Sequence, residues 1–595
     1  MPSTKQDHSS SPPGLGFLPD STTPLLQSRQ HTAENVDYST TDSESYREAS
    51  QATDSNILAA TQSSAVEDEP NESRDTASRE NDEEEGIAIL GGLQLGLLTF
   101  GLSLATFIVA LDNTIIATAI PRITSAFNSL DDVGWYGSTY LLTVTALQPS
   151  FGRIYTFFNV KHVYLFGMAV FEIGSVLCGA ARNSNMFILG RVVAGVGEAA
   201  LYSGSMTIIG LTVPLNRRPM YLALLSSMYA ICSVIGPLIG GVLTDRASWR
   251  WCFWINLPLG AIGFAAVVFF FKPPRRTEDL LSTKQKIREI DILGTFTLSC
   301  SVICLLVALQ WAGTSYPWNN PKVWGVLLGS CLLAVGFIAQ QIRRGERATI
   351  PPRILGQKTV FWSCLYAFLL SMGTFTHIYY LPFYFQAVRG TSAEGSGIRT
   401  IPYLASNIIA SIIIAGGTTV VGVLKPFMIF GAAVFTIGSG LIYTLQADSS
   451  AGKWIGYQVM GGFGAEAGVQ LPFLAVQAVL SQRDMPTGVA ITTFFDSLGG
   501  ALAISVAQNL FYNGLRTNIP KYAPEVPAEV VISTGPSCLA ELISPKSLPR
   551  VRKAYMEALR NSFVLAVVVG VLGIVCACFV EWRSIRNKKT ASDED

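Results

Sequence analysis

Fourteen apolar stretches dominate this chain, and each is about 20 residues long, enough to cross the roughly 30 Å hydrocarbon core of a membrane. Such a segment spans lipid as an α-helix, because its backbone polar groups must be hydrogen-bonded internally. Composition agrees, since 49% of the residues are hydrophobic and 14% are charged. The sequence therefore predicts an all-α polytopic membrane protein with 14 transmembrane helices, at approximately 95–120, 135–155, 163–181, 184–211, 219–243, 252–271, 291–311, 322–341, 360–382, 397–420, 425–445, 454–480, 487–511 and 561–581.

Polar segments divide the predicted helices into groups. Residues 1–86 are rich in Ser, Thr, Asp and Glu, so they cannot bury enough surface to fold alone and are expected to form a disordered cytosolic tail. After this tail we predict an N-terminal six-helix bundle at 95–271, a cytosolic loop at 272–290, two extra transmembrane helices at 291–341, a C-terminal six-helix bundle at 360–581 with an extracellular loop at 512–560, and a cytosolic tail at 582–595.

Lysine and arginine in the short connections predict the orientation. With the N-terminus placed inside, the inner connections and the C-terminal tail carry 21 of these residues, and the outer short connections carry eight. Short loops rich in positive charge stay on the cytoplasmic side. We therefore expect both termini to be cytosolic.

The fifth predicted helix contains a glycine and proline pattern that no enzyme core needs, Gly236-Pro237-x-x-Gly240-Gly241. Glycines let two helices touch backbone to backbone, and a proline frees a carbonyl group and bends the helix. The pattern resembles the antiporter motif of the Major Facilitator Superfamily, specifically of its fourteen-spanner drug:proton antiporters, a group that includes fungal toxin-efflux pumps. We interpret these four residues as a gating element.

This resemblance implies a fold and an activity. The fold has two six-helix bundles, with the two extra helices between them. The implied activity is proton-coupled export of a small amphipathic toxin, secondary metabolite or drug across the plasma membrane by alternating access. The expected setting is a monomer in the lipid bilayer, driven by the proton gradient without a bound cofactor.

Two charged residues inside the predicted helices form the candidate proton-coupling site. Asp112 lies in a run that resembles the family's first-helix motif, and Arg191 in a run that resembles its fourth-helix motif. At 1.5 Å per residue both lie roughly 11–12 Å below the outer surface, so they can pair. The proton affinity of an acid that faces an arginine depends on whether the arginine is engaged elsewhere. A purely structural ion pair is the alternative.

Four more acids lie within predicted helices. We expect Glu172 to make a structural hydrogen bond and Glu466, inside Gly464-x-x-x-Gly468, to mark close helix contact. Glu198 and Asp496 stand where the family usually has uncharged residues. They are assigned to polar packing, with a second proton site or a cation-attracting site as the alternative.

The connection between the second and third helices resembles the superfamily's signature loop in altered form. Gly152, Arg153 and Lys161 are present, but Thr156 replaces the usual acidic residue and Asn159 the second glycine. The charge latch that biases the inner gate is therefore weakened, and the sequence does not indicate what replaces it. This variant resembles the fungal toxin-efflux branch.

Polar side chains along the predicted helices are candidates to line a substrate cavity, because they offer hydrogen bonds in an otherwise apolar setting. They are Tyr140, Gln148, Glu198, Gln470, Gln477 and Asp496.

Several classes of protein are disfavoured. There is no phosphate-binding loop for ATP hydrolysis, no metal-ligand spacing, no nucleophile-base pattern of an enzyme, and no indication of a nucleic-acid partner. The one cysteine of the long outer loop, Cys538, argues against a disulfide framework. Two alternatives remain, namely a siderophore or basic amino acid transporter of the plasma or vacuolar membrane, and a non-transporting receptor.

Overall fold

The computed structural model describes residues 92–127, 129, 132–274, 282–312, 316–534 and 539–585. The predicted cytosolic tail at 1–86, Cys538 and most of the tail at 582–595 lie outside the described residues.

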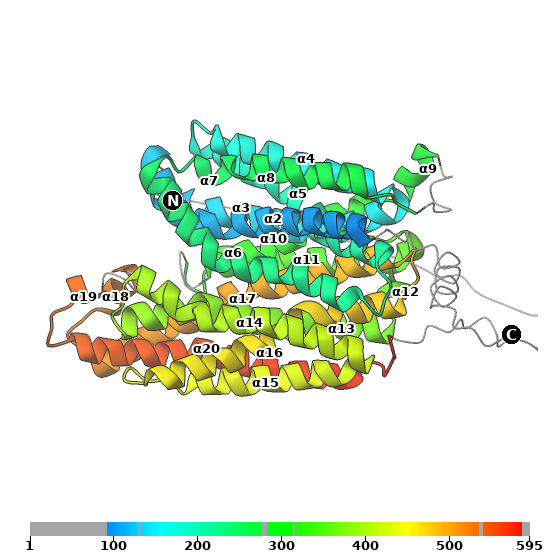
Figure 1. Ribbon diagram of the computed structural model, residues 1–595. Helices are drawn as coiled ribbons and strands as arrows, with labels where there is room; N and C mark the ends of the chain where they lie inside the picture. Colours follow the sequence, from blue (N-terminus) through cyan, green and yellow to red (C-terminus); the bar gives the residue numbers. More distant parts are fainter. Residues whose placement is uncertain are drawn as a thin grey trace, which may run out of the picture. The chain divides into compact units, whose positions relative to one another are not determined.

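Fourteen long helical segments account for most of the described residues (Figure 1). Thirteen are long and apolar enough to cross a membrane by themselves. The remaining one, α3, contains Ser, Thr and Gln but packs against α5, α10 and α17. The predicted all-helical membrane fold is confirmed, with segments α2 (Gly92–Phe127), α3 (Val133–Phe157), α4 (Val160–Gly179), α5 (Ser184–Thr212), α6 (Arg218–Arg246), α7 with α8 (Trp251–Trp254, Asn256–Phe270), α10 (Ile292–Trp311), α11 (Pro321–Arg344), α13 (Lys358–Phe383), α14 (Ala393–Val421), α15 (Lys425–Tyr443), α16 (Ala451–Val479), α17 (Met485–Tyr522) and α20 (Leu548–Phe579).

Helical structure extends into the segment 512–560, which was expected to be a loop. The helix α17 continues to Tyr522, and α20 already begins at Leu548. Between them lie the short helices α18 (Ala528–Thr534) and α19 (Leu539–Leu542). Each extension has one buried face and one polar face, so hydropathy alone underestimates its length.

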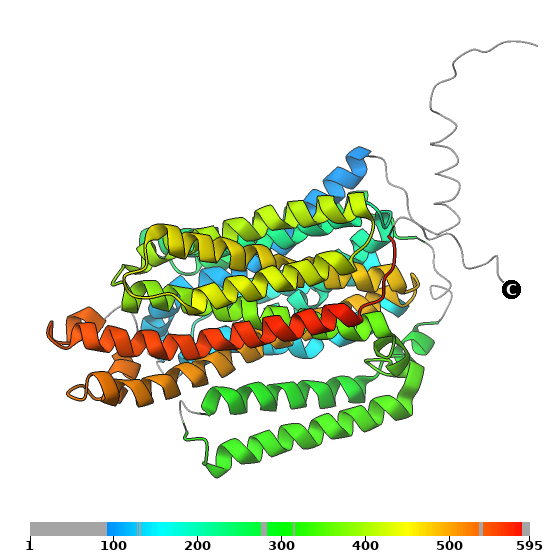
Figure 2. The same ribbon diagram turned by 90° about the horizontal axis from the view of Figure 1, so that it is seen from below.

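The long helices form two halves. In the first half α2 packs on α6 and α8, and α5 packs on α3 and α4. In the second half α13 packs on α16, α17 and α20, while α16 also contacts α14 and α15. The halves meet where α3 contacts α17 and where α6 contacts α14. The extra pair α10 and α11, green in Figure 2, lies to one side, and its helix α10 contacts α3 and α17.

The two ends of the helices are distinguished by their short elements. The helices α9 (Thr283–Arg288) and α12 (Pro352–Leu355) lie at one end, which we call the α9 end (Figure 1). The helices α18 and α19 lie at the opposite end, which we call the α18 end (Figure 1).

Equivalent lysines fasten equivalent helices in the two halves. Lys161, at the start of α4, donates hydrogen bonds to the carbonyls of Val268 (2.6 Å) and Phe271 (2.9 Å) at the end of α8. Lys425, at the start of α15, donates to the carbonyl of Cys578 (2.7 Å) at the end of α20. A lysine at these positions satisfies carbonyls that a helix end leaves unpaired. The two halves are therefore built to the same local plan.

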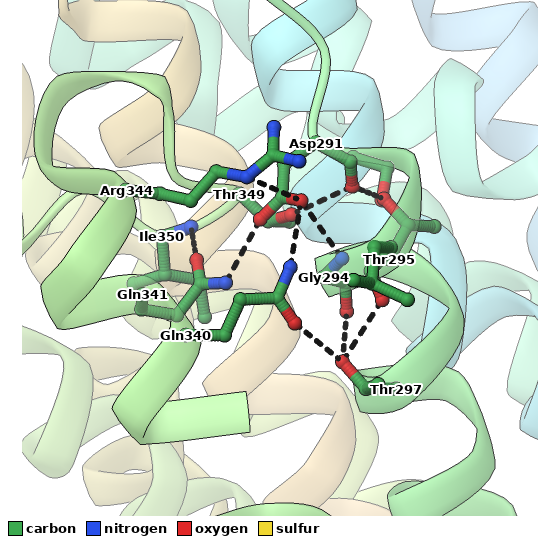
Figure 3. Close-up of polar contacts among 11 residues, drawn as sticks. Asp291, Gly294, Thr295, Thr297, Gln340, Gln341, Arg344, Thr349 and Ile350 are labelled. Atoms are coloured by element: carbon green, nitrogen blue, oxygen red, sulfur yellow. Dashed lines mark hydrogen bonds and ion pairs between the residues drawn. The ribbon is translucent and has the colours of Figure 1, made fainter. Parts of the chain in front are cut away.

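A buried aspartate fastens the two helices of the extra pair to each other at the α9 end (Figure 3). Asp291 is fully buried and caps α10 by accepting a hydrogen bond from the backbone N–H of Gly294 (2.8 Å). Its two oxygens also accept from the amides of Gln340 and Gln341 on α11, each at 2.9 Å. Arg344 approaches at 3.6 Å and partly balances the charge.

Asp291→Ala is expected to lower stability by at least about 2 kcal/mol, because it leaves the two glutamine amides and a cap N–H without their acceptor. Thermal unfolding of the purified protein at a fixed scan rate should show a clear decrease in the midpoint. The midpoint of Asp291→Asn, which keeps one acceptor oxygen, should lie between those of the wild type and Asp291→Ala. A wild-type midpoint for Asp291→Ala would contradict this role.

Candidate functional site

Asp112 of α2 and Arg191 of α5 form a buried ion pair. The distance from Arg191 Nη1 to Asp112 Oδ2 is 2.5 Å, and each side chain is 1% exposed. Arg191 Nε donates to the carbonyl of Tyr136 (3.1 Å), and the guanidinium carbon lies 4.1 Å from the centre of the Tyr140 ring. The structure thus brings together the two residues that the sequence proposed as partners.

Asn256 of α8 completes the contacts of the Asp112 carboxyl group, and the sequence did not identify it as a partner. Its amide nitrogen lies 3.4 Å from Asp112 Oδ1 and 3.2 Å from the hydroxyl of Ser175 on α4. The side chain is fully buried, and its carbonyl oxygen has no partner among the described residues. In the sequence, Asn256 is recognisable only as a polar residue at the start of the apolar run that forms α8. An amide beside a carboxyl group can pair with either its charged or its neutral form.

A second carboxyl group lies next to this pair. Glu198 of α5 accepts hydrogen bonds from the amide of Asn113 (3.2 Å) and from the hydroxyl of Tyr229 (3.3 Å). The hydroxyl of Tyr140 lies within hydrogen-bonding reach of the same carboxyl group. Because Asn113 follows Asp112 on α2, the two carboxyl sites are linked through adjacent residues of one helix.

The glycines of α6 place its backbone directly against α2, beside the ion pair. A Cβ atom on Gly236 would lie 2.9 Å from Thr114 Cβ, and one on Gly240 would lie 2.9 Å from the carbonyl oxygen of Ile115. Thr114 also donates to the carbonyl of Cys232 (3.0 Å). The four motif residues do not share one environment, because nothing lies within 4 Å of the equivalent atom on Gly241. Pro237 lies within α6, which continues past it.

At the α9 end, α3 packs tightly against the start of α17. The hydroxyls of Thr156 and Thr487 are 2.8 Å apart. A Cβ atom on Gly152 would lie 3.1 Å from Thr487 Cα. The threonine that replaces the acidic residue of the signature loop therefore makes a neutral hydrogen bond between the halves.

Two candidate cavity residues also join the halves. Gln470 of α16 donates to the carbonyl of Pro219 (2.5 Å), and Gln477 donates to the carbonyl of Met206 (3.3 Å). Both side chains are buried. Of the other candidates, Gln148 is buried with its carbonyl oxygen unpaired among the described residues, and Asp496 is partly buried on α17.

The connection between α11 and α13 supplies the ionic contacts that the signature loop lacks. Arg153 Nη2 donates to the carbonyl of Glu346 (2.7 Å), in the short η3 turn (Gly345–Arg347). Arg353 of α12 pairs with the Glu346 carboxylate (2.9 Å) and with both oxygens of Asp484 (3.0 Å each), which precedes α17. This connection thus ties α3 of the first half to α17 of the second.

Arg153→Ala is expected to open the α9 end more than Arg353→Ala. Arg153 is 5% exposed, and a buried charge-assisted hydrogen bond contributes about 1.5–3 kcal/mol. The Arg353 side chain is 56% exposed, and surface ion pairs contribute about 0–1 kcal/mol. Thr487 is fully buried between the halves, so a cysteine at this position reports opening of the α9 end. Thr487→Cys should react faster with a soluble thiol reagent when it is combined with Arg153→Ala than when it is combined with Arg353→Ala. Equal reaction rates in these two double variants would contradict the ranking.

Burial of the central helices shows which end is closed. The residues Gly197–Thr212 of α5, Gln470–Ala478 of α16 and Met485–Phe494 of α17 are all buried. Further toward the α18 end, residues 192–193 and 495–498 are partly exposed. The halves are therefore closed together at the α9 end and less tightly packed beyond it.

One expectation about the buried acids is wrong. Glu172 of α4 was expected to make a structural hydrogen bond, but neither of its carboxyl oxygens has a partner among the described residues. The carboxyl group packs against Gly260 of α8, where it meets no donor.

Comparison with known protein families explains this arrangement. A family model of the Major Facilitator Superfamily matches residues 102–504. The chain belongs to this superfamily. The glycines of α6 and the buried residues of α2 and α5 described above fall within the matched range, whereas α20 lies beyond it.

Relatives in this superfamily are similar over most of their length. An Arthroderma benhamiae protein named MFS-type efflux pump MFS1 is 44% identical over 499 residues, covering 84% of this chain and 93% of the relative. The Penicillium rubens efflux pump roqT is 44% identical over 498 residues, covering 84% and 92%. The aspyridones efflux protein of Neocamarosporium betae is 40% identical over 518 residues, covering 86% and 92%. Together they indicate that the chain is an efflux transporter.

Solved structures of the superfamily share the fold. The proton:xylose symporter XylE, solved with a bound glucose derivative, aligns with a TM-score of 0.51 at 14% identity, covering 82% of this chain and 96% of that chain. The human organic anion transporter MFSD10 aligns with a TM-score of 0.50 at 13% identity, covering 80% and 98%. At these identities the likeness supports the fold alone.

Proposed function

We propose that the protein exports a small amphipathic toxin, secondary metabolite or drug across the plasma membrane, in exchange for protons. The observation that carries this proposal is the buried pair of Asp112 and Arg191, adjacent to the contact between α2 and α6. Relatives that are 40–44% identical are named an efflux pump and an aspyridones efflux protein, and these names support export of a small molecule.

The proposed orientation places the α9 end in the cytosol, together with both termini. Its support is the excess of lysine and arginine in the connections at this end. In this orientation the described conformation is closed to the cytosol. The proposed substrate site between the halves would then release substrate to the outside and take up protons from the outside.

The proposed coupling depends on exchange at Asp112. While Asp112 is ionised, Arg191 is held by it, by the Tyr136 carbonyl and by the Tyr140 ring. A proton on Asp112 removes the charge that holds the guanidinium and leaves Asn256 to pair with the neutral acid. Because Gly236 and Gly240 place α6 against the next turn of α2, a shift of α2 is passed directly to α6. Proton binding and helix movement are thereby linked.

The proposed substrate site uses protein groups alone. Glu198 and Tyr140 offer a carboxyl and a hydroxyl group that lie close to each other, and Gln148 offers a carbonyl oxygen without a partner among the described residues. Such groups can bind polar atoms of a largely apolar molecule. One chain in the bilayer is sufficient for this scheme, and no cofactor is needed.

The proposal is tested by expression in a host that lacks its own efflux pumps. Cells with the wild-type protein should retain less of a loaded amphipathic dye or of the relatives' class of metabolite than cells with Asp112→Asn. A protonophore should remove the difference. Equal retention in all these cells, for every compound in a chemically diverse panel, would contradict export.

A further inference from the structure

Glu466 of α16 is a buried acid that connects the two halves, and the proposed coupling at Asp112 does not use it. Its side chain is 1% exposed, and Oε1 lies 2.9 Å from the hydroxyl oxygen of Ser226 on α6. The flanking glycines make the expected close contacts, since a Cβ atom on Gly464 would collide with Phe435 and one on Gly468 with Leu370. The acid therefore has a fixed position between the halves.

The groups around Glu466 are neutral. Asn407 of α14 lies within hydrogen-bonding reach of the carboxyl group, together with Ser226 of α6. Tyr202 of α5 is the titratable side chain in electrostatic contact with it, and Asp496 of α17 faces the same tyrosine. No lysine, arginine or histidine forms an ion pair with Glu466 in the part of the chain that the structure describes. Asp112, in contrast, has Arg191.

Hydrogen-bond accounting indicates which protonation state fits this conformation. The hydroxyl of Ser226 lies 3.1 Å from the carbonyl of Ala223, one turn earlier in α6, as well as 2.9 Å from Glu466. A hydroxyl has one proton and accepts further bonds through its oxygen. Both contacts are hydrogen bonds at once when Ser226 donates to Ala223 and a protonated Glu466 donates to Ser226.

We propose, building on the function proposed above, that Glu466 is a second protonation site of the transport cycle and that its neutral acid form keeps the α9 end closed. An ionised carboxyl group at this position would be buried without a counter-charge, which is strongly unfavourable. When water reaches the opened interface, the O–H bond of the acid breaks and the proton passes to water. The resulting carboxylate is stable only while it is hydrated, so it favours the open α9 end.

The two acids then have different tasks. Asp112 exchanges Arg191 for a proton within the first half, whereas Glu466 changes the contact between the halves. Closing the α9 end requires that Glu466 takes up a proton, so the balance between closed and open states depends on pH at that end. One proton changes such an equilibrium by up to about tenfold per pH unit.

The test measures opening without a substrate. The full-length Thr487→Cys protein, in membranes, is treated with a soluble thiol reagent over a range of pH, alone and combined with Glu466→Gln. Glutamine keeps the shape and stays neutral at every pH. Each rate is divided by that of the Glu466→Gln form at the same pH, which cancels the intrinsic pH dependence of the thiol.

The normalised rate is expected to rise steeply with pH, by at least about fivefold and up to the one-proton limit of about tenfold per pH unit. Glu172→Gln is the matched control, because Glu172 is another acid within a helix but makes no hydrogen bond between the halves. It should retain the full rise. In infrared difference spectra, the C=O band of a protonated acid should be present in wild type at low pH and absent from Glu466→Gln.

A normalised rate that stays flat with pH would overturn the proposal. So would an infrared band that is unchanged in Glu466→Gln. Either result, obtained while flux remains proton-driven, would remove the role of Glu466 and leave the export proposal standing. A steep rise without any proton-driven flux would instead support the role of Glu466 in opening and count against antiport.

Discussion

Asp112→Asn is expected to abolish proton-driven transport. Asparagine keeps the size and an acceptor oxygen but cannot exchange a proton, and it leaves Arg191 buried without its counter-charge. An uncompensated buried charge costs about 3–5 kcal/mol. Because asparagine cannot exchange a proton, flux into vesicles under an imposed pH gradient should fall to the level of vesicles without the protein.

The matched control removes both charges together. Asp112→Asn combined with Arg191→Gln should recover thermal stability relative to Asp112→Asn alone, because no buried charge remains unpaired. It should not recover proton-driven flux. If Asp112→Asn retained flux that follows the gradient, the ion pair would be structural and the coupling site would lie elsewhere.

Gly240→Val is expected to inactivate the transporter, whereas Gly241→Val should be tolerated. A side chain on Gly240 would meet the backbone carbonyl of Ile115, which cannot move without shifting α2. Overpacking of this kind costs about 1–3 kcal/mol. Gly241 lies on the same helix with nothing within 4 Å, so the same residue there changes helix propensity without a clash.

Gly240→Val and Gly241→Val are best compared by the transport rate divided by the amount of folded protein. Gly240→Val should show reduced thermal stability and little flux, and Gly236→Val should behave similarly because its neighbour is Thr114. Equal activity of Gly240→Val and Gly241→Val would show that α2 and α6 need not touch for transport.

The fold could be predicted from the sequence because the membrane imposes it. Fourteen apolar stretches of sufficient length must be helices in lipid, and their ends agree with the structure to within a few residues for most helices. The exceptions have polar faces. The end of α17 and the start of α20 bury residues such as Leu515, Ile519 and Val551 against each other while exposing charged residues, so average hydropathy does not detect them.

Of the candidate site, the pairing of Asp112 with Arg191 could be predicted from depth, because helix rise converts sequence position into distance along the membrane normal. The contribution of Asn256 could not, because its partner lies 144 residues away and an amide leaves no charge pattern. The same limit applies to the contact of Glu466 with Ser226, 240 residues apart.

The replacement for the charge latch was also beyond the reach of local sequence. It depends on the connection between α11 and α13, which returns to α3. There Arg153 donates a hydrogen bond to the carbonyl of Glu346. Gln470 and Gln477 show the reverse case, since their residue type suggested an open cavity and the fold places them between the halves. Only the three-dimensional arrangement separates a cavity residue from a gate residue.

One measurement tests proton-coupled export most directly. Inside-out membrane vesicles that carry the wild-type protein are energised so that their interior is acidic. They are incubated with a metabolite extract of the organism that encodes the protein, and the compounds inside the vesicles are then identified by mass spectrometry. We predict that at least one compound accumulates, that a protonophore abolishes its accumulation, and that Asp112→Asn vesicles do not accumulate it. Accumulation that is unchanged by the protonophore, or no accumulation of any compound, would contradict the account.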